Sequence, residues 1–233
     1  MKLSRPQLHQ TEKGYSIVEL LVVVAILAIM STVALIYATA HKKLYEPDDQ
    51  ALQLSDIFQE ARQRALTQRR TMRVEVNLAS NTAKLYDENQ NATSSSDDFL
   101  IRSLNLFASA RVRVDARPSE IGYNPPELMS VPNAVYSPSV YTPTVSQSAL
   151  TVRFLANGSA VNAGTNSIGT GAVPTGVSLH IWSPKESNNV ESDIARCLTV
   201  LGATGIIRLW EFDRNSSASN KWKDSRRSSS YGS

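Results

Sequence analysis

The chain is poor in the residues that build disulfides and most catalytic centres. Cys197 is the only cysteine among 233 residues, so no intramolecular disulfide can form. No CxxC pair and no histidine at ligand spacing accompany it, so a buried structural thiol is expected. Of the three histidines, His180 has no motif around it and fits an alternating strand position. We therefore expect no catalytic residue, no cofactor and no metal site.

A strong net charge of either sign is also missing. Lys and Arg number 24 against 21 Asp and Glu, which gives a formal net charge of +3. Residues 1–14 carry +2 of this, because Lys2, Arg5 and Lys13 oppose Glu12, and the remainder carries +1. A nearly neutral body gives no general argument for binding nucleic acid.

Charge is absent altogether from residues 20–37, where Ser31 and Thr32 are the only polar side chains. An α-helix of this length spans about 27 Å, close to the thickness of a hydrocarbon core. A secretory signal peptide could end at Ala38-Thr39-Ala40, but its apolar region is usually only about 7–15 residues long. A plain single-pass anchor is a second alternative.

A third interpretation gives a role to Glu19, which lies at the beginning of this run. A carboxylate at the centre of a membrane helix costs about 2.5–3.5 kcal/mol on insertion scales, and less near an end. Glu19 therefore needs either a cation as partner or a position at the membrane interface.

The residues around Glu19 resemble a known processing signal. Gly14 is followed by Tyr15, and the stretch Ser16-Ile17-Val18-Glu19-Leu20 leads into the apolar run. This pattern is similar to the class III leader of type IV pilins and type II secretion pseudopilins. The resemblance implies cleavage by a prepilin peptidase between Gly14 and Tyr15, and methylation of the new amino terminus at Tyr15. It also implies that Glu19 neutralises an N-terminal amine during filament assembly. The usual first mature residue is Phe, and Tyr15 keeps the ring.

The segment 41–70 is predicted to continue the helix as an amphipathic one. Pro47 lacks an N–H and clashes with the preceding turn, so a kink or short break is expected near residues 46–49. Apolar residues then recur every three or four positions, which predicts one face packed on a sheet. They are Leu54, Ile57, Phe58, Ala61, Ala65 and Leu66.

From residue 71 onward the apolar period changes to two, which predicts strands. Residues 72–78 and 83–86 form a predicted hairpin around Ser80-Asn81-Thr82. Six of the ten prolines fall between residues 117 and 145, so an exposed loop is expected within an insert at about 116–148. The residues 214–233 have little to bury and are expected to form a mobile basic tail. Further strands are expected at 99–107, 111–115, 150–155, 177–182, 195–201 and 205–212.

Three later blocks resemble one branch of the pilin-like proteins. They are Ala61 to Leu66, Val152 to Gly158 and Arg196 to Gly205. These blocks are similar to those of the GspH/FimT group, which contains H-type minor pseudopilins and T-type minor pilins. The resemblance implies a pilin-like α+β fold, in which a long N-terminal helix packs on antiparallel β-sheets. The first half of that helix would be transmembrane and the second half amphipathic.

The expected organisation follows from these segments. Residues 1–14 are a leader peptide, 15–40 a transmembrane helix and assembly segment, 41–70 the amphipathic helix, and 71–213 an exported β-rich domain. Basic residues before the span favour a cytoplasmic N-terminus and a periplasmic body, held as a single pass in the inner membrane. The resemblance implies four partners: prepilin peptidase, other pilin or pseudopilin subunits, an inner-membrane assembly platform and the lipid bilayer.

Nucleic-acid binding is the alternative function. Flexible cations in the tail could contact phosphates while an aromatic ring stacks on a base. Some T-type minor pilins resemble this in using a Gly-Arg-x-Arg motif, whereas this chain has Gly205-Ile206-Ile207-Arg208. The candidate contacts are Arg208, Lys221, Lys223, Arg226 and Arg227.

Two weaker patterns point to ligands. Gly164 to Gly171 has the glycine spacing of a phosphate loop, but Thr170 stands where the lysine belongs. Asp97 and Asp98 could contribute calcium ligands, although an isolated acidic pair is more often solvated.

Overall fold

The computed structural model describes most of the chain after the leader. The described residues are 15–78, 80–88, 98–107, 111–114, 121–127, 136–138, 148–164, 168–182, 195–213, 215–216 and 219–225, with the backbone alone described at 38–44, 111, 113–114, 136–138 and 148–149. Residues 1–42 and 43–233 form separate compact units.

Helix α1 (Ile17–Gln68) begins in the first unit and extends through the first 26 residues of the second. A kink or short break was predicted near Pro47, and of these two the break is wrong, because the helix continues through this residue. Two tertiary contacts hold the following turn in place. Asp48 forms an ion pair with Arg196, and the Gln50 Oε1 accepts a hydrogen bond of 2.7 Å from the Phe107 amide. These contacts offset the one hydrogen bond that proline removes.

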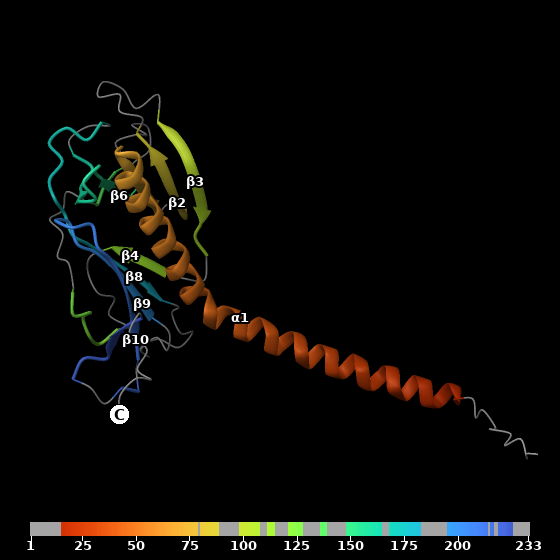
Figure 1. Cartoon of the computed structure of the whole chain (residues 1–233). Coiled ribbons are helices and arrows are strands. Elements are labelled where there is room, and N and C mark those ends of the chain that lie inside the picture. The colour runs from red at the N-terminus through yellow and green to blue at the C-terminus, as the bar shows by residue number, and fades with distance from the viewer. Residues whose placement is uncertain are drawn as a thin grey trace, which may run out of the picture. The chain divides into compact units, whose positions relative to one another are not determined.

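Two antiparallel sheets follow α1 among the described residues (Figure 1). The first sheet has the strand order β3-β2-β1-β6-β5, with β7 also paired to β6, and the second has the order β11-β10-β9-β8-β4. The predicted hairpin is confirmed, with Met72 opposite Asp87 and Asn77 opposite Thr82. Asn81 adopts a φ of +51° in its turn. The strands are β1 (Met72–Asn77), β2 (Thr82–Asp87), β3 (Phe99–Asn105), β4 (Arg111–Val114), β5 (Tyr136–Pro138), β6 (Ser148–Phe154), β7 (Ala160–Val161), β8 (Val177–Trp182), β9 (Ala195–Val200), β10 (Ile207–Phe212) and β11 (Trp222–Asp224).

The main core lies between α1 and both sheets. Its helical members recur at three- and four-residue spacing from Ala51 to Ala65, as the amphipathic pattern predicts. Phe58 packs edge-on against Phe154 of β6, with ring centroids 6.3 Å apart. The α+β prediction, a long N-terminal helix packed on antiparallel sheets, is therefore confirmed.

A second core covers the other face of the β8–β10 sheet. Cys197 and Trp210 lie on neighbouring strands, opposite each other in the register, and Ile121 and Trp222 pack with them. Because both faces of this sheet are covered, all six residues of β8 are buried rather than alternating. His180 lies in the centre of that strand, fully buried, 6.3 Å from the Trp222 ring.

The second core corrects two predictions. The segment after Asp213 was expected to bury little, yet Trp222 is buried in β11 and its Nε1 donates to the Tyr123 carbonyl at 2.7 Å. Within the insert, residues 121–127 are not simply an exposed loop, because Ile121 is fully buried. A tryptophan buries a large apolar area, which favours packing of its otherwise polar segment against the second core. The other residues of the insert and tail lie largely outside the described residues.

Candidate processing and assembly site

The beginning of α1 is defined by Ser16. Its Oγ accepts a hydrogen bond from the Val18 amide at 3.4 Å, and its carbonyl accepts one from the Leu20 amide at 3.1 Å. This is the bonding pattern of an N-cap residue. The helix therefore starts at Ile17, two residues after Tyr15, which is exposed.

Glu19 lies in the first turn of α1, three residues after the Ser16 cap. A carboxylate there interacts favourably with the partial positive charge of the helix N-terminus. In the part of the chain that the structure describes, Glu19 forms no ion pair. The cap was not predicted, although Ser16-Ile17-Val18-Glu19 has the S-x-x-E pattern that marks helix starts.

The surface that follows Glu19 is apolar on every side. Residues Ile17–Tyr37 have a mean hydropathy of 2.8 and are long enough to cross a membrane, and no part of this segment is buried within the chain. The exposed fractions of its large apolar side chains run from 48% at Val33 to 84% at Ile17. An apolar surface this extensive requires lipid or other protein to cover it.

The two polar side chains within this span bond to the helix itself. The Ser31 Oγ donates to the Leu27 carbonyl at 2.7 Å, and the Thr32 Oγ1 donates to the Ala28 carbonyl at 2.9 Å. Both hydroxyls are satisfied locally, as a hydrocarbon environment requires. Glu19 is thus the one acidic or basic side chain of residues 17–37, and it lies at the end of the segment.

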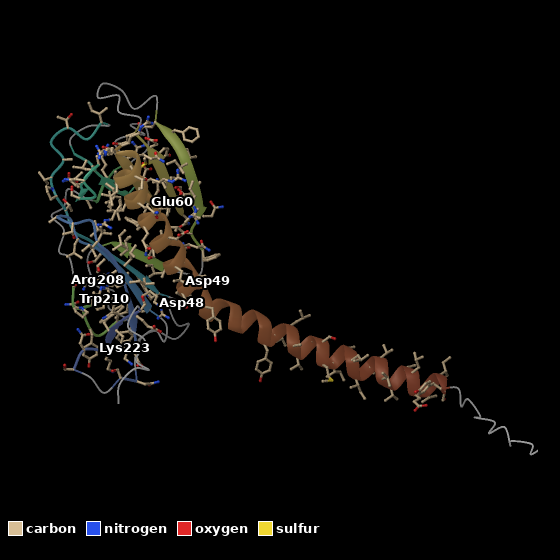
Figure 2. The ribbon with its side chains drawn as sticks, in the orientation of Figure 1. Asp48, Asp49, Glu60, Arg208, Trp210 and Lys223 are labelled. Carbon is tan, nitrogen blue, oxygen red and sulfur yellow. The ribbon has the colours of Figure 1, made fainter. Side chains whose placement is uncertain are left out.

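The predicted nucleic-acid contacts do not form a free basic surface in the described residues. Arg208 pairs with Glu127, and the Lys223 Nζ lies 2.5 Å from the Asp213 Oδ2. Arg208 and Lys223 are labelled in Figure 2. The hydrogen bond from Lys223 holds the pKa of the Asp213 carboxyl below its usual value. Lys221 lies over the Tyr123 ring, 5.2 Å from its centroid.

Of the two aromatic residues in the tail, Trp222 and Tyr231, only Trp222 lies among the described residues. Trp222 is buried in the second core, so its face cannot stack on a base. Arg226 and Arg227 lie outside the described residues. The positive charges at Arg208 and Lys223 are each balanced by a carboxylate of the same chain.

The weaker ligand patterns lead to a buried ion cluster. Arg73 bonds to Asp98 at 2.6 Å and to Glu88 at 3.1 Å, while the Arg153 Nε bonds to Glu88 at 2.7 Å. Asp98 is therefore engaged by a cation of the protein, and Asp97 lies outside the described residues. Burial lowers the pKa of Arg153, and the neighbouring Glu88 opposes that shift.

Arg153 also supports the glycine-rich segment that has phosphate-loop spacing. Its Nη1 donates to the Ala163 carbonyl, and a Cβ added at Gly169 would lie only 3.0 Å from the guanidinium. Gly169 has a φ of +77°. The next described element after this segment is strand β8, so no helix N-terminus faces it. The arginine and glycine together have a structural role.

Cys197 has the properties expected of an inert thiol. It is fully buried between β8 and β10, and burial raises its pKa well above the ordinary value. Among the described residues, no group of three or more His, Cys, Asp or Glu side chains could hold a metal ion.

Comparison with known proteins assigns the N-terminal segment to a class. Residues 10–35 match the prokaryotic N-terminal methylation motif, a region that contains Gly14, Tyr15 and Glu19. The predicted prepilin-type leader is confirmed by this match. A leader of this kind implies processing by a prepilin peptidase and assembly with other pilins, and the apolar helix beside it indicates a membrane-anchored subunit.

Solved structures with some similarity to the chain include two minor subunits. The minor pseudopilin EpsH from the type 2 secretion system of Vibrio cholerae is 10% identical, with a TM-score of 0.41 over 70% of this chain and 95% of that chain. The type IV minor pilin FimU of Pseudomonas aeruginosa is 17% identical, with a TM-score of 0.39 over 70% of this chain and 87% of that chain. A search of curated proteins found no match.

Proposed function

We propose that this chain is a minor pilin or pseudopilin precursor, a structural subunit of a type IV pilus or a type II secretion pseudopilus. The observation that carries the proposal is the methylation motif at residues 10–35, which overlaps a helix of membrane-spanning length. The three sequence blocks that resemble the GspH/FimT group support the minor branch. The role is structural and not enzymatic.

In this proposal the peptidase cleaves between Gly14 and Tyr15 and methylates the new amino terminus at Tyr15. The observed helix start supports this position. Tyr15 precedes the Ser16 cap, so the cleaved bond lies outside the hydrogen-bonded turns of α1. A protease needs an extended segment at its active site, and residues before an N-cap can supply one without unwinding the helix.

Glu19 is the proposed assembly carboxylate. Cleavage would create a positive charge at Tyr15, near the first turn of a helix whose remaining span is apolar. Moving such a helix from lipid into a filament would bury both charges, and burial of an unpaired charge is costly. Pairing of Glu19 with an N-terminal amine, its own or that of a neighbouring subunit, would remove that cost.

The proposed location follows from the same segment. Residues 17–37 would cross the inner membrane once, and the body from residue 43 onward would be periplasmic before assembly. The basic leader residues Lys2, Arg5 and Lys13 would remain on the cytoplasmic side. The assembly platform in that membrane is the remaining proposed partner.

Processing can be tested by the mass of the full-length protein extracted from membranes. The wild-type chain is expected to begin at Tyr15 and to carry one added methyl group. The Gly14→Ala variant should accumulate as the uncleaved precursor, because a Cβ would occupy space beside the scissile bond. Thr32→Ala, inside the span, is the matched control and should be cleaved normally. Normal cleavage of Gly14→Ala would contradict the assignment of the leader.

Assembly can be tested independently with Glu19→Ala. This variant should still be cleaved at Tyr15, but its recovery in sheared filaments should fall at least about tenfold, which corresponds to about 1.4 kcal/mol. Glu19→Asp keeps the carboxylate and should retain part of the wild-type incorporation. Equal recovery of Glu19→Ala and the wild-type chain in filaments would rule out the proposed role of Glu19.

A further inference from the structure

The exposed face of the second half of α1 changes its chemistry along its length. Its beginning carries Tyr45, Asp49 and Leu52, which follow one another at helical spacing, and Tyr45 and Leu52 are 58% and 53% exposed. Asp49 is exposed and forms no ion pair within the described part of the chain. This end of the helix therefore presents an uncompensated acid between two apolar side chains. Figure 2 labels Asp49.

The other end of the same helix contributes to a groove of about 460 Å³. Its helical wall is formed by Gln59, Arg62, Gln63 and Leu66, and its second wall by Ile206 and Ile207. Leu66 and Ile206 are 42% and 36% exposed, so the groove presents apolar surface to the outside.

The turn beside the groove is fixed by a close backbone approach. Gly205 has a φ of +61°, and a Cβ there would lie 1.9 Å from the Gly158 carbonyl oxygen. No other residue fits this position without displacing the chain. The groove is thus preformed, because the conformation that exposes Ile206 is imposed by the packing of two turns.

Arg62 supplies a positive charge to this groove. Its Nε and Nη2 donate to the Thr204 carbonyl at 3.3 and 3.1 Å, which positions the guanidinium without neutralising it. Among the described residues, Arg62 has no carboxylate partner. The neighbouring Glu60 is engaged elsewhere, by Arg64 and Arg102. The groove therefore combines one positive charge, amide groups and aliphatic side chains.

We propose that this groove binds the Tyr45–Asp49–Leu52 stripe of a second copy of the chain, with the two helices parallel. Asp49 precedes Leu52 by three residues, and Arg62 precedes Leu66 by four. Both steps correspond to about one helical turn of 5.4 Å. One offset of 13 to 14 residues, about 20 Å, therefore places Asp49 beside Arg62 and Leu52 beside Leu66.

These two pairs also fix the relative direction of the two helices. In an antiparallel arrangement, placing Asp49 beside Arg62 would move Leu52 away from Leu66. The two ends of the exposed face thus complement each other in charge and in apolar surface.

A contact between two different surfaces of identical chains is heterologous. When two copies are joined in this way, the groove of one copy and the stripe of the other remain unoccupied. Such a contact can repeat along an axis, whereas a symmetric dimer contact closes on itself. The inference deepens the proposed function and rests on it, because a filament subunit is where an offset, repeatable contact is used.

Disulfide cross-linking of the full-length protein in detergent tests the contact. Chains with Leu52→Cys are mixed with chains carrying Leu66→Cys, and the two are distinguished by mass. The native Cys197 is fully buried and should contribute no background. The mixed 52–66 product should exceed both symmetric products several-fold. Leu52→Cys mixed with Leu100→Cys, an exposed position on β3, is the control and should give only random cross-linking.

A charge exchange tests the pairing without depending on the stability of one variant. Arg62→Glu in the Leu66→Cys chain should reduce the mixed product several-fold. Asp49→Arg in the Leu52→Cys chain should restore it, because the two charges are then interchanged. Restoration cannot arise from a misfolded groove. Mixed product at the control level, dominance of the symmetric products, or failure of the exchange to restore it would each overturn the proposal.

Failure of the proposed contact can be distinguished from failure of the proposed function, because cleavage at Tyr15 is measured by mass in each sample as well. A chain that is cleaved at Tyr15 and enters filaments but gives no 52–66 product overturns the contact alone. A chain that gives the product but is neither cleaved nor assembled overturns the proposed function alone. In cells, cross-linking of Leu66→Cys to a different subunit, with no 52–66 product, would also overturn the second copy as occupant.

Discussion

The two halves of helix α1 differ in how their apolar side chains are distributed and in what covers them. Between Ile17 and Tyr37 the apolar side chains cover every side of the helix, and none of that span is buried within the chain. Between Ala51 and Ala65 all of them but Leu52 occupy one side, and each of the core residues there is fully buried. A helix that is apolar all round must be covered by something outside the chain, whereas an amphipathic one is covered by its own sheets.

This difference separates two kinds of stability. The second half contributes to the folding free energy of the body, through burial against β-strands. The first half contributes to the partition of the chain between water, lipid and a filament. Mutations in the two halves should therefore be visible in different measurements, and paired substitutions can test that separation.

The largest expected effect is on the folding of the body. Phe58→Ala should lower the free energy of unfolding by about 3–5 kcal/mol, because it removes a fully buried ring from the contact with Phe154. Ile29→Ala, at an exposed position of the first half, should leave that free energy unchanged. Denaturant unfolding of the full chain in detergent, followed by tryptophan fluorescence, measures both. Equal effects from the two substitutions would remove the distinction between the halves.

A charge in the middle of the first half should produce the next largest effect. Leu27→Arg should cost about 2.5–3.5 kcal/mol in membrane insertion, because the guanidinium would lie near the centre of the hydrocarbon. Its expected signature is loss of the protein from the carbonate-resistant membrane fraction, with the unfolding of the body unchanged.

The matched substitution Leu52→Arg places the same charge on the exposed face of the second half. It should keep the chain in the membrane fraction and change the stability of the body by no more than about 0.5 kcal/mol. Retention of Leu27→Arg in the membrane at the level of Leu52→Arg would show that residues 17–37 do not span the bilayer.

The smallest effect is expected from two neighbouring acids at the beginning of the second half. Asp48→Ala removes a 2.7 Å contact to Arg196 and should lower the free energy of unfolding by about 0.2–1 kcal/mol. Asp49→Ala removes no ion pair of the described chain and should have no measurable effect on folding. The same denaturant experiment measures both, and a larger loss for Asp49→Ala would mean that this acid stabilises its own chain.

Much of the fold could be predicted from local patterns. The change of apolar period from about 3.6 to 2 near residue 71 marks the end of the helix and the beginning of the hairpin, and both are confirmed. Strands β5, β7 and β11 were not predicted. They contain two or three residues each, too few to show any periodicity.

The second core was missed for a related reason. Trp222 lies between Lys221 and Lys223, in a segment rich in Ser and Asn, and nothing in that sequence indicates burial. Its burial depends on Ile121, about 100 residues earlier in the chain. The buried position of Arg153 is equally hidden, because its carboxylate partner Glu88 is 65 residues away.

At the candidate site, by contrast, the sequence carried nearly all of the information. The leader, Glu19 and the apolar span are defined by residue type and order, since a hydrocarbon environment selects composition and not partners. Tertiary structure decided which charges are neutralised and which remain available. Arg208 and Lys223 are neutralised by Glu127 and Asp213, while Arg62 keeps its charge beside an exposed groove. Such pairings join residues far apart in the chain, and only folding brings them together.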